Sequence, residues 1–236
     1  HMLMRVSIGI HKNDIDEVST VDDSGDGQPA EVQDNGADET GCISVEGHVK
    51  IFDPNNGEVI IDKRNQIHYE NISESLAQSL ANKNLGYIYQ MSFGNGGTSV
   101  DPTGIITYLP PNSTGQNADL YNETYSKVVD DNSSTNTDTT RNNLTVLHTS
   151  GKVYTDILVS TVLDYGEPLG QQAFDNSTNL DGEYVFDELG IKTWNGSASD
   201  LKLVTHLVMH PVQKALNRQL QIDYTIRIQA LTNLSA

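Results

Sequence analysis

Apolar and polar residues alternate along much of the chain after residue 47, as they do in half-buried β-strands. The clearest example is the segment 218–231 near the end. One face of that segment carries Leu220, Ile222, Tyr224, Ile226, Ile228 and Ala230, and the other carries Gln219, Gln221, Asp223, Thr225, Arg227 and Gln229. A period of two predicts one side on a core and one side at solvent or at an interface, which favours an antiparallel sheet.

Other segments of this kind predict the remaining strands. A hairpin is expected over 48–62, with its turn at 53–57, where Asp, Pro, Asn and Gly gather. Further strands are expected over 87–93, 103–109, 125–129, 143–149, 154–163 and 201–211, the last of which forms a final pair with 218–231. Polar stretches at 112–123 and 130–143 are expected to be long surface loops. Together these features predict an antiparallel β-sandwich or jelly-roll-like domain.

One segment has a helical period. Ile72, Leu76 and Leu80 recur every four residues and form a single apolar stripe over 71–82. Asn71 is a favourable N-cap residue, and Glu74 stands three residues further on, as in a capping box. The sequence therefore predicts one α-helix, capped by Asn71 and Glu74.

The stretch MSFGNGGTSVDPTG, residues 91–104, resembles a phosphate-binding loop because Gly94, Gly96 and Gly97 lie within four positions. Such a loop needs a lysine and must open onto a helix. Here no lysine follows, and Pro102 precedes an expected strand. We interpret the three glycines as a structural corner, in which positive φ angles let the chain leave a strand.

Charge is concentrated at the start of the chain. The net charge is −18, and residues 13–46 hold eleven acidic residues without any lysine or arginine. This segment also has few apolar residues, and their burial cannot offset the entropy lost when the segment is ordered. We therefore expect residues 1–46 to form an extended or disordered arm that begins with a cloning remnant, His1-Met2. A β-sandwich domain then covers 47–236. A protein surface with this large negative charge repels nucleic acid. No apolar run reaches the roughly 20 residues of a membrane span.

Within the arm, Asp22, Ser24, Asp26 and Gly27 match the early positions of a calcium loop. The glutamate that this loop requires is replaced by Gln33, so we expect no calcium site there. The acidic side chains Asp22, Asp23 and Asp26 are instead a possible interface with a basic neighbour.

Candidate catalytic and metal-binding residues are scattered. His206 and His210 are expected to share a strand face, and His148 is a third possible ligand, but no further ligand joins them. The carboxylates Asp164, Glu167, Asp187 and Glu188 lie near strand ends without a recognisable arrangement. No Gly-x-Ser-x-Gly motif is present. The sequence therefore predicts no catalytic residue, no cofactor and no metal.

The order of the motifs carries more information than any one of them. GEVIIDKRNQI (57–67) precedes the expected helix, YIYQMSFGNGGTSVDPTG follows it, and YVFDELGIKTW (184–194) and LVTHLVMHPVQKALNRQLQIDYTIRI (203–228) come late. This order resembles a broad family of tailed-bacteriophage virion proteins, in particular structural proteins of contractile-tailed phages of marine bacteria, including cyanophages. FGNGG replaces the LGTG that is commoner in that family, and Tyr224 stands where tryptophan is frequent.

The resemblance implies a non-catalytic virion structural protein, made in the host bacterial cytoplasm, in the tail, neck or baseplate. Its partners would be other virion proteins in a symmetric homo-oligomer, and the polar face of the last strand, with Gln221 and Arg227, is a possible interface. A capsid decoration protein is the alternative. A further alternative is a carbohydrate-binding receptor-recognition module, for which Trp194 is the candidate platform.

Overall fold

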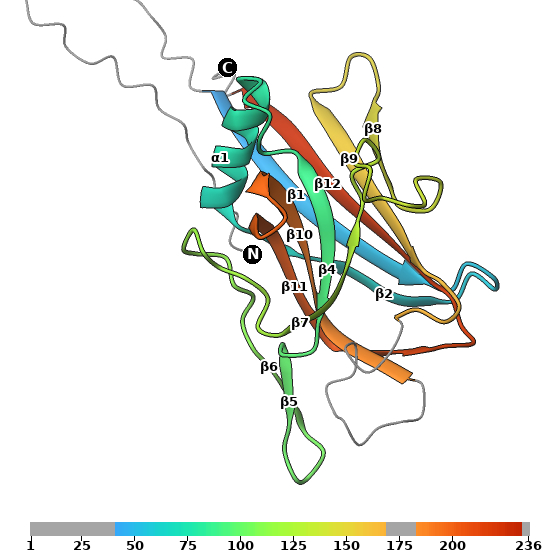
Figure 1. The fold of residues 1–236 in the computed structure, drawn as a ribbon. Helices are drawn as coiled ribbons and strands as arrows, with labels where there is room; N and C mark the ends of the chain where they lie inside the picture. Colours follow the sequence, from blue (N-terminus) through green and yellow to red (C-terminus); the bar gives the residue numbers. More distant parts are fainter. Residues whose placement is uncertain (1–40, 169–182, 233–236) are drawn as a thin grey trace, which may run out of the picture.

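The computed structural model describes residues 41–168 and 183–232, which form two antiparallel five-stranded sheets, a short hairpin and one helix (Figure 1). Sheet A contains, in spatial order, β2 (Val59–Arg64), β1 (Gly41–Phe52), β12 (Leu220–Thr232), β9 (Tyr154–Leu163) and β8 (Asn143–His148). Sheet B contains β3 (Gln66–Ile67), β11 (Asp200–Ala215), β10 (Glu183–Ser197), β4 (Ile88–Gly94) and β7 (Glu123–Val128). The predicted mainly-β, sandwich-like fold with a single helix is confirmed.

The core lies between the two sheets. The strand β12 shows why the alternation matters, because Leu220, Ile222, Tyr224 and Ile226 are all buried and point towards sheet B. From sheet B, Phe93 and Phe186 meet edge to face with ring centroids 5.4 Å apart. These aromatic and branched side chains join residues from both sheets into one apolar cluster. Burial of this cluster is the main force that holds the sheets together.

The hairpin expected over 48–62 is confirmed. β1 pairs with β2, and Gly57 closes the turn with φ 76°. β4, β7, β8 and β9 also lie close to their expected positions.

Two expectations about the strands are wrong. β11 and β12 follow each other in the chain but do not pair, because β11 lies between β3 and β10 in sheet B, whereas β12 lies between β1 and β9 in sheet A. The chain crosses from one sheet to the other after Ala215, which places the apolar faces of both strands on the shared core. Residues 41–46, assigned to the acidic arm, instead form the first half of β1 and pair with β12. The rest of the arm lies outside the described residues.

The helix α1 (Tyr69–Leu80) begins two residues before its expected start. His68 is the N-cap, because its Nδ1 accepts a hydrogen bond from the backbone N–H of Asn71. The prediction that Asn71 and Glu74 cap the helix is therefore wrong. Asn71 is buried in the first turn, and its side-chain amide donates to the carbonyl of Leu203 at 2.8 Å. Within the described residues, no helix is long and apolar enough to cross a membrane.

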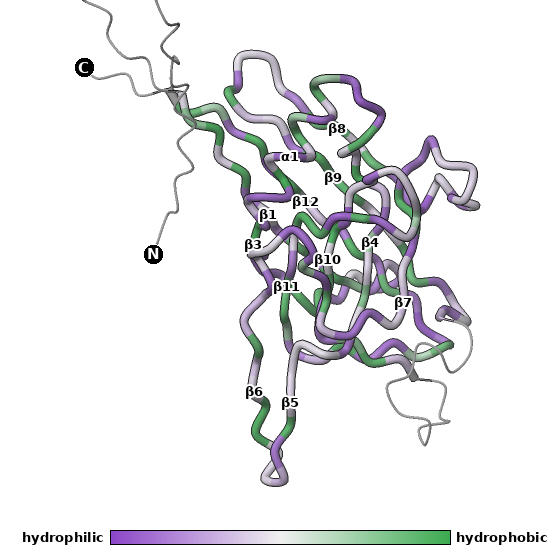
Figure 2. Tube along the Cα trace, turned by 60° about the vertical axis from the view of Figure 1, so that its left-hand side comes forward, coloured by the Kyte–Doolittle hydropathy of each residue, from purple (hydrophilic) through white to green (hydrophobic). Residues whose placement is uncertain are grey.

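The expected strand over 103–109 is one half of a small hairpin that stands away from the body. Its strands are β5 (Thr98–Val100) and β6 (Ile106–Tyr108), which pair only with each other. Figure 2 shows this hairpin projecting below the two sheets, with hydrophobic residues along it. Val100 is 62% exposed. An isolated two-stranded hairpin is only marginally stable in water, so this projection is suited to contact with a neighbouring molecule.

The stretch 112–123 is expected to be a surface loop, but part of it covers the outer face of sheet B, and we call this stretch the covering loop. Leu120 is only 7% exposed. It packs so closely on Gly190 of β10 that a Cβ added to this glycine would lie 3.1 Å from Cδ2 of Leu120. The backbone N–H of Asn112 reaches His206 on β11. Polar side chains on this face of the sheet are therefore shielded from solvent.

Candidate functional site

The glycine-rich stretch after β4 binds two carboxylates of its own chain. The N–H of Gly97 donates to Oδ1 of Asp187 at 2.9 Å, and the N–H of Thr98 donates to Oδ2 at 2.9 Å. The N–H of Gly96 donates to Oε1 of Glu188 at 3.0 Å. Successive backbone N–H groups form an anion-binding concavity, and here β10 supplies the anions. The stretch therefore resembles a phosphate loop in its chemistry, but its binding groups are already occupied.

The three glycines are needed for space and not for positive φ angles. None of Gly94, Gly96 and Gly97 has a positive φ, so this part of the prediction is wrong. A Cβ at Gly94 would lie 2.5 Å from the carbonyl oxygen of Asn122 and 2.5 Å from Oε1 of Glu188. A Cβ at Gly96 would lie 2.7 Å from that of Tyr121. At Gly94 and Gly96, neighbouring backbone and a carboxylate approach too closely for a side chain.

Glu188 is the centre of this arrangement. It is fully buried, and the backbone N–H groups of Tyr121 and Asn122 each donate to it at 2.8 Å, in addition to Gly96. Nε2 of His206 lies 3.0 Å from its Oε2. Burial alone would raise the pKa of Glu188, but these hydrogen bonds outweigh burial and hold the pKa below its usual value. Glu188 is therefore a buried carboxylate with four donors.

The neighbouring Asp187 behaves differently. Burial raises the pKa of its carboxyl group, and the hydrogen bonds from Thr98 and Gly97 only partly offset that effect. The Thr98 hydroxyl makes a further close contact with Oδ2. The two adjacent carboxylates thus tie the same loop to β10 in different electrostatic environments.

His206 is fully buried and both ring nitrogens are engaged. Nδ1 accepts a hydrogen bond from the N–H of Asn112 at 2.7 Å, which leaves the proton on Nε2 for donation to Glu188. His210 was expected to share its face, but a bulge between Val208 and Val212 interrupts the alternation, and His210 is exposed beside the Tyr108 hydroxyl at 3.2 Å. Within the described residues, no group of three or more His, Cys, Asp or Glu side chains is arranged to hold a metal.

Lys192 extends this polar layer along β10. Its ammonium group contacts the carboxylates of Asp119 and Glu123, and Glu123 also accepts a hydrogen bond from Gln90 at 3.1 Å. The Lys192 side chain is 8% exposed. Burial lowers the pKa of this lysine, but the two carboxylates outweigh it and raise the pKa above its usual value. Lys192 therefore acts as a second attachment of the covering loop to sheet B.

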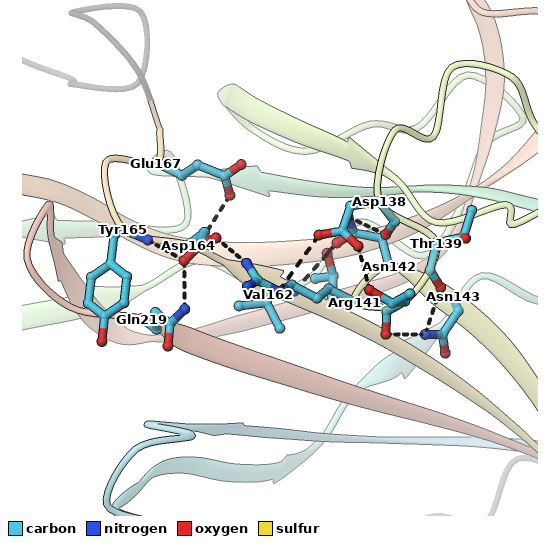
Figure 3. A network of polar contacts seen from close by, with 12 residues as sticks. Asp138, Thr139, Arg141, Asn142, Asn143, Val162, Asp164, Tyr165, Glu167 and Gln219 are labelled. Carbon is cyan, nitrogen blue, oxygen red and sulfur yellow. Dashed lines mark hydrogen bonds and ion pairs between the residues drawn. The ribbon is translucent and has the colours of Figure 1, made fainter.

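The other candidate carboxylates form a separate network, drawn in Figure 3. Asp164 accepts a hydrogen bond from Gln219 at 2.6 Å and is paired with Arg141. Both contacts lower the pKa of Asp164, and the hydrogen bond from Gln219 has the larger effect. Oε2 of Glu167 accepts from the N–H of Asp164 at 2.9 Å and pairs with Lys127 at 2.7 Å. This network links the 130–143 loop to the ends of β9 and β12. Its carboxylates are bound by a different set of partners from those of Asp187 and Glu188.

An open depression of about 440 Å³ lies on another part of the surface, lined by Ile60, Val185, His210, Pro211, Val212, Gln213 and Arg218. None of the four candidate carboxylates lines it. Its titratable side chains are those of His210 and Arg218, and Arg218 is already paired with Asp53 at 3.1 Å and with Glu58 at 3.1 Å. The depression thus lacks an acid and base pair.

The suggested interface residues of β12 make contacts within the chain. Arg227 forms a two-pronged contact with Asp156 at 2.8 and 2.9 Å and lies over the ring of Tyr154, 4.1 Å from its centroid. Gln221 donates to Asp223 at 3.0 Å. These contacts order the polar outer face of sheet A. The other suggested interface residues, Asp22, Asp23 and Asp26, lie outside the described residues.

Trp194 has neighbours that the sequence pattern did not place beside it. The ring of Tyr87 stacks on Trp194 with centroids 6.2 Å apart, and the ring of Tyr89 lies at 4.7 Å. Trp194 is half-buried and not fully exposed. A possible signal was present in the sequence, because Tyr87 and Tyr89 are two apart at the start of a predicted strand.

Comparison with known proteins gave no relative: no protein family, no curated protein and no solved structure matches this chain.

Proposed function

We propose that the chain is a non-catalytic structural protein of a bacteriophage virion, located in the tail, neck or baseplate. The observation that carries the proposal is a pair of hydrogen bonds between two of the motifs on which the resemblance to phage virion proteins rests. FGNGG and DELGI lie about ninety residues apart, and Gly96 and Gly97 of the first donate to Glu188 and Asp187 of the second. Both motifs therefore belong to one scaffold, which gives a physical reason for their occurrence together in one chain.

The chemistry of the site supports a structural role. A catalytic acid or base must reach a substrate, but Glu188 and His206 are fully buried and bonded within the chain. The exposed apolar residues of the β5–β6 hairpin, among them Val100 and Tyr108, instead offer a surface to a neighbouring virion protein.

The test is immunogold electron microscopy of phage particles whose genome encodes this sequence, with antibodies raised against the purified chain. We expect gold at the tail, neck or baseplate. Gold over the head surface would favour the capsid decoration alternative. Particles that carry no label, together with mass spectra of purified particles that lack the chain, would refute a virion role.

A second candidate function is carbohydrate binding at Trp194, because Tyr87 and Tyr89 flank it and aromatic rings stack on sugar rings. Trp194 is the only tryptophan, so its fluorescence reports on that site alone. Titration with host surface polysaccharide should change the emission of the wild-type protein and of the control Tyr165→Ala, but not that of Tyr87→Ala. An unchanged emission of the wild-type protein would exclude this function.

A further inference from the structure

The two sheets have four outer edges, and three of them are protected against pairing with another strand. β2 carries Asp62, Lys63 and Arg64, and β7 carries Glu123 and Lys127. β3 is only two residues long. Charged side chains and short edge strands are the usual means by which proteins prevent edge-to-edge association.

The fourth edge, β8, has no such protection. Its sequence, NLTVLH, contains no lysine, arginine, aspartate or glutamate. Val146 is 68% exposed and Leu147 is 49% exposed. β8 pairs with β9 on one side, and among the described residues no strand pairs with its other side, which lies at the outer limit of sheet A (Figure 1). An apolar, uncharged edge strand is a site for strand addition.

We propose that β8 binds β8 of a second copy of this chain, so that the two copies of sheet A form one continuous antiparallel sheet. The charge of the chain affects where two copies can meet, because two molecules of net charge −18 repel each other and β8 is an edge at which no like-charged side chains come to lie opposite each other. An antiparallel edge is also self-complementary about a two-fold axis, since the same N–H and C=O groups face each other from both sides. The pairing is independent of the virion proposal.

The pattern of side chains selects the register. Leu144 and Val146 lie opposite Val159 and Ile157 of β9, on the core-facing side of sheet A. A two-fold axis at Thr145 places Leu144 of each copy opposite Val146 of the other and keeps these side chains on one face. An axis at Val146 would place Leu144 opposite His148, so the axis at Thr145 is the better match. The contact is short, and we expect a weak, concentration-dependent dimer.

The first test is a concentration series by size-exclusion chromatography with light scattering. We expect the mass of the wild-type protein to rise towards that of a dimer with concentration, and Val146→Lys to remain a monomer. Val59→Lys places the same charge at an exposed valine on β2, at the opposite edge of sheet A, and should dimerise like the wild-type protein. A wild-type protein that stays monomeric, or a Val146→Lys variant that still dimerises, would overturn the proposal.

The second test probes the register by oxidation of single-cysteine variants in a Cys42→Ser background. Residues opposite each other in antiparallel strands have Cα atoms about 4.5–5.5 Å apart, which a disulfide can span. Thr145→Cys should therefore form a cross-linked dimer. Ser73→Cys, at an exposed residue of α1, is the matched control and should not. Equal cross-linking of the two variants would contradict the β8 contact.

Discussion

Replacement of Glu188 by alanine is the most direct test of the buried carboxylate as a structural lock. The substitution removes the acceptor of four donors, namely the N–H groups of Gly96, Tyr121 and Asn122 and the Nε2–H of His206. These donors come from the glycine corner, from the covering loop and from β11. All three would lose their hydrogen bonds to Glu188 in a single change, while the contacts of Asp187 and Lys192 and the pairing of β11 with β10 would remain.

The expected loss of stability follows from the number of donors. A buried donor without a partner costs about 1–3 kcal/mol, and the breaking of a buried charged contact costs about 3–5 kcal/mol in total. Water will enter the space left by the side chain and satisfy part of the four donors, so we expect a loss of about 3–5 kcal/mol. For a domain of this size each kcal/mol corresponds to about 2–4 °C, which predicts a fall in Tm of roughly 10 °C.

Urea unfolding followed by the fluorescence of Trp194 measures this loss. Glu74→Ala is the matched control, because Glu74 lies on α1 and has no side-chain hydrogen bond in the described part of the chain. If Glu188→Ala unfolds within about 1 kcal/mol of the wild-type protein, the four contacts do not stabilise the fold and the reasoning is refuted.

Three other predictions concern the same region. The pKa of Glu188 lies below its usual 4.5, so the contribution of its carboxylate to the unfolding free energy is complete above pH 4.5 and is lost as the pH falls through the lowered pKa. The unfolding free energy should therefore fall less steeply with acid for Glu188→Gln than for the wild-type protein. Equal slopes of unfolding free energy against pH would contradict the shift. Gly94→Ala should lower the unfolding free energy by about 1–3 kcal/mol, as measured in urea, because its Cβ would meet a backbone oxygen, whereas Gly41→Ala, with open space around it, should have no effect. Asn71→Ala should cost about 1–3 kcal/mol by thermal unfolding, because it leaves the carbonyl of Leu203 without that donor. Glu74→Ala should cost less than about 0.5 kcal/mol, and a loss of about 1 kcal/mol or more would instead support a capping role for Glu74.

The sequence predicted those elements whose two faces differ in environment. β12 has a core on one side and solvent on the other, so its alternation was legible. β10 was not among the predicted strands, because the covering loop buries its outer face as well. Glu188 and Gly190 on that face are as buried as Leu189 and Ile191 on the core side, and a period of two then has no meaning.

The candidate site was predictable in its parts but not in its connections. The glycine stretch and the late acidic segment were both recognised, yet the hydrogen bonds between them depend on β4 lying beside β10. The helix cap was wrong for a similar reason. Asn71 has a high intrinsic tendency to cap, but the carbonyl of Leu203 binds its amide, and His68 occupies the cap position instead.

The pairing of β1 with β12 determines how the fold would respond to mechanical force. Gly41 lies opposite Thr232, so the two ends of the described domain leave it side by side, away from the β5–β6 hairpin (Figure 1). Tension applied between these ends would separate β1 from β12 one hydrogen bond at a time, which is the weak, unzipping direction of an antiparallel ladder. Tension between either end and the hairpin would load many hydrogen bonds at once in shear. A molecule tethered at its ends and at the hairpin would therefore transmit load through its strong direction.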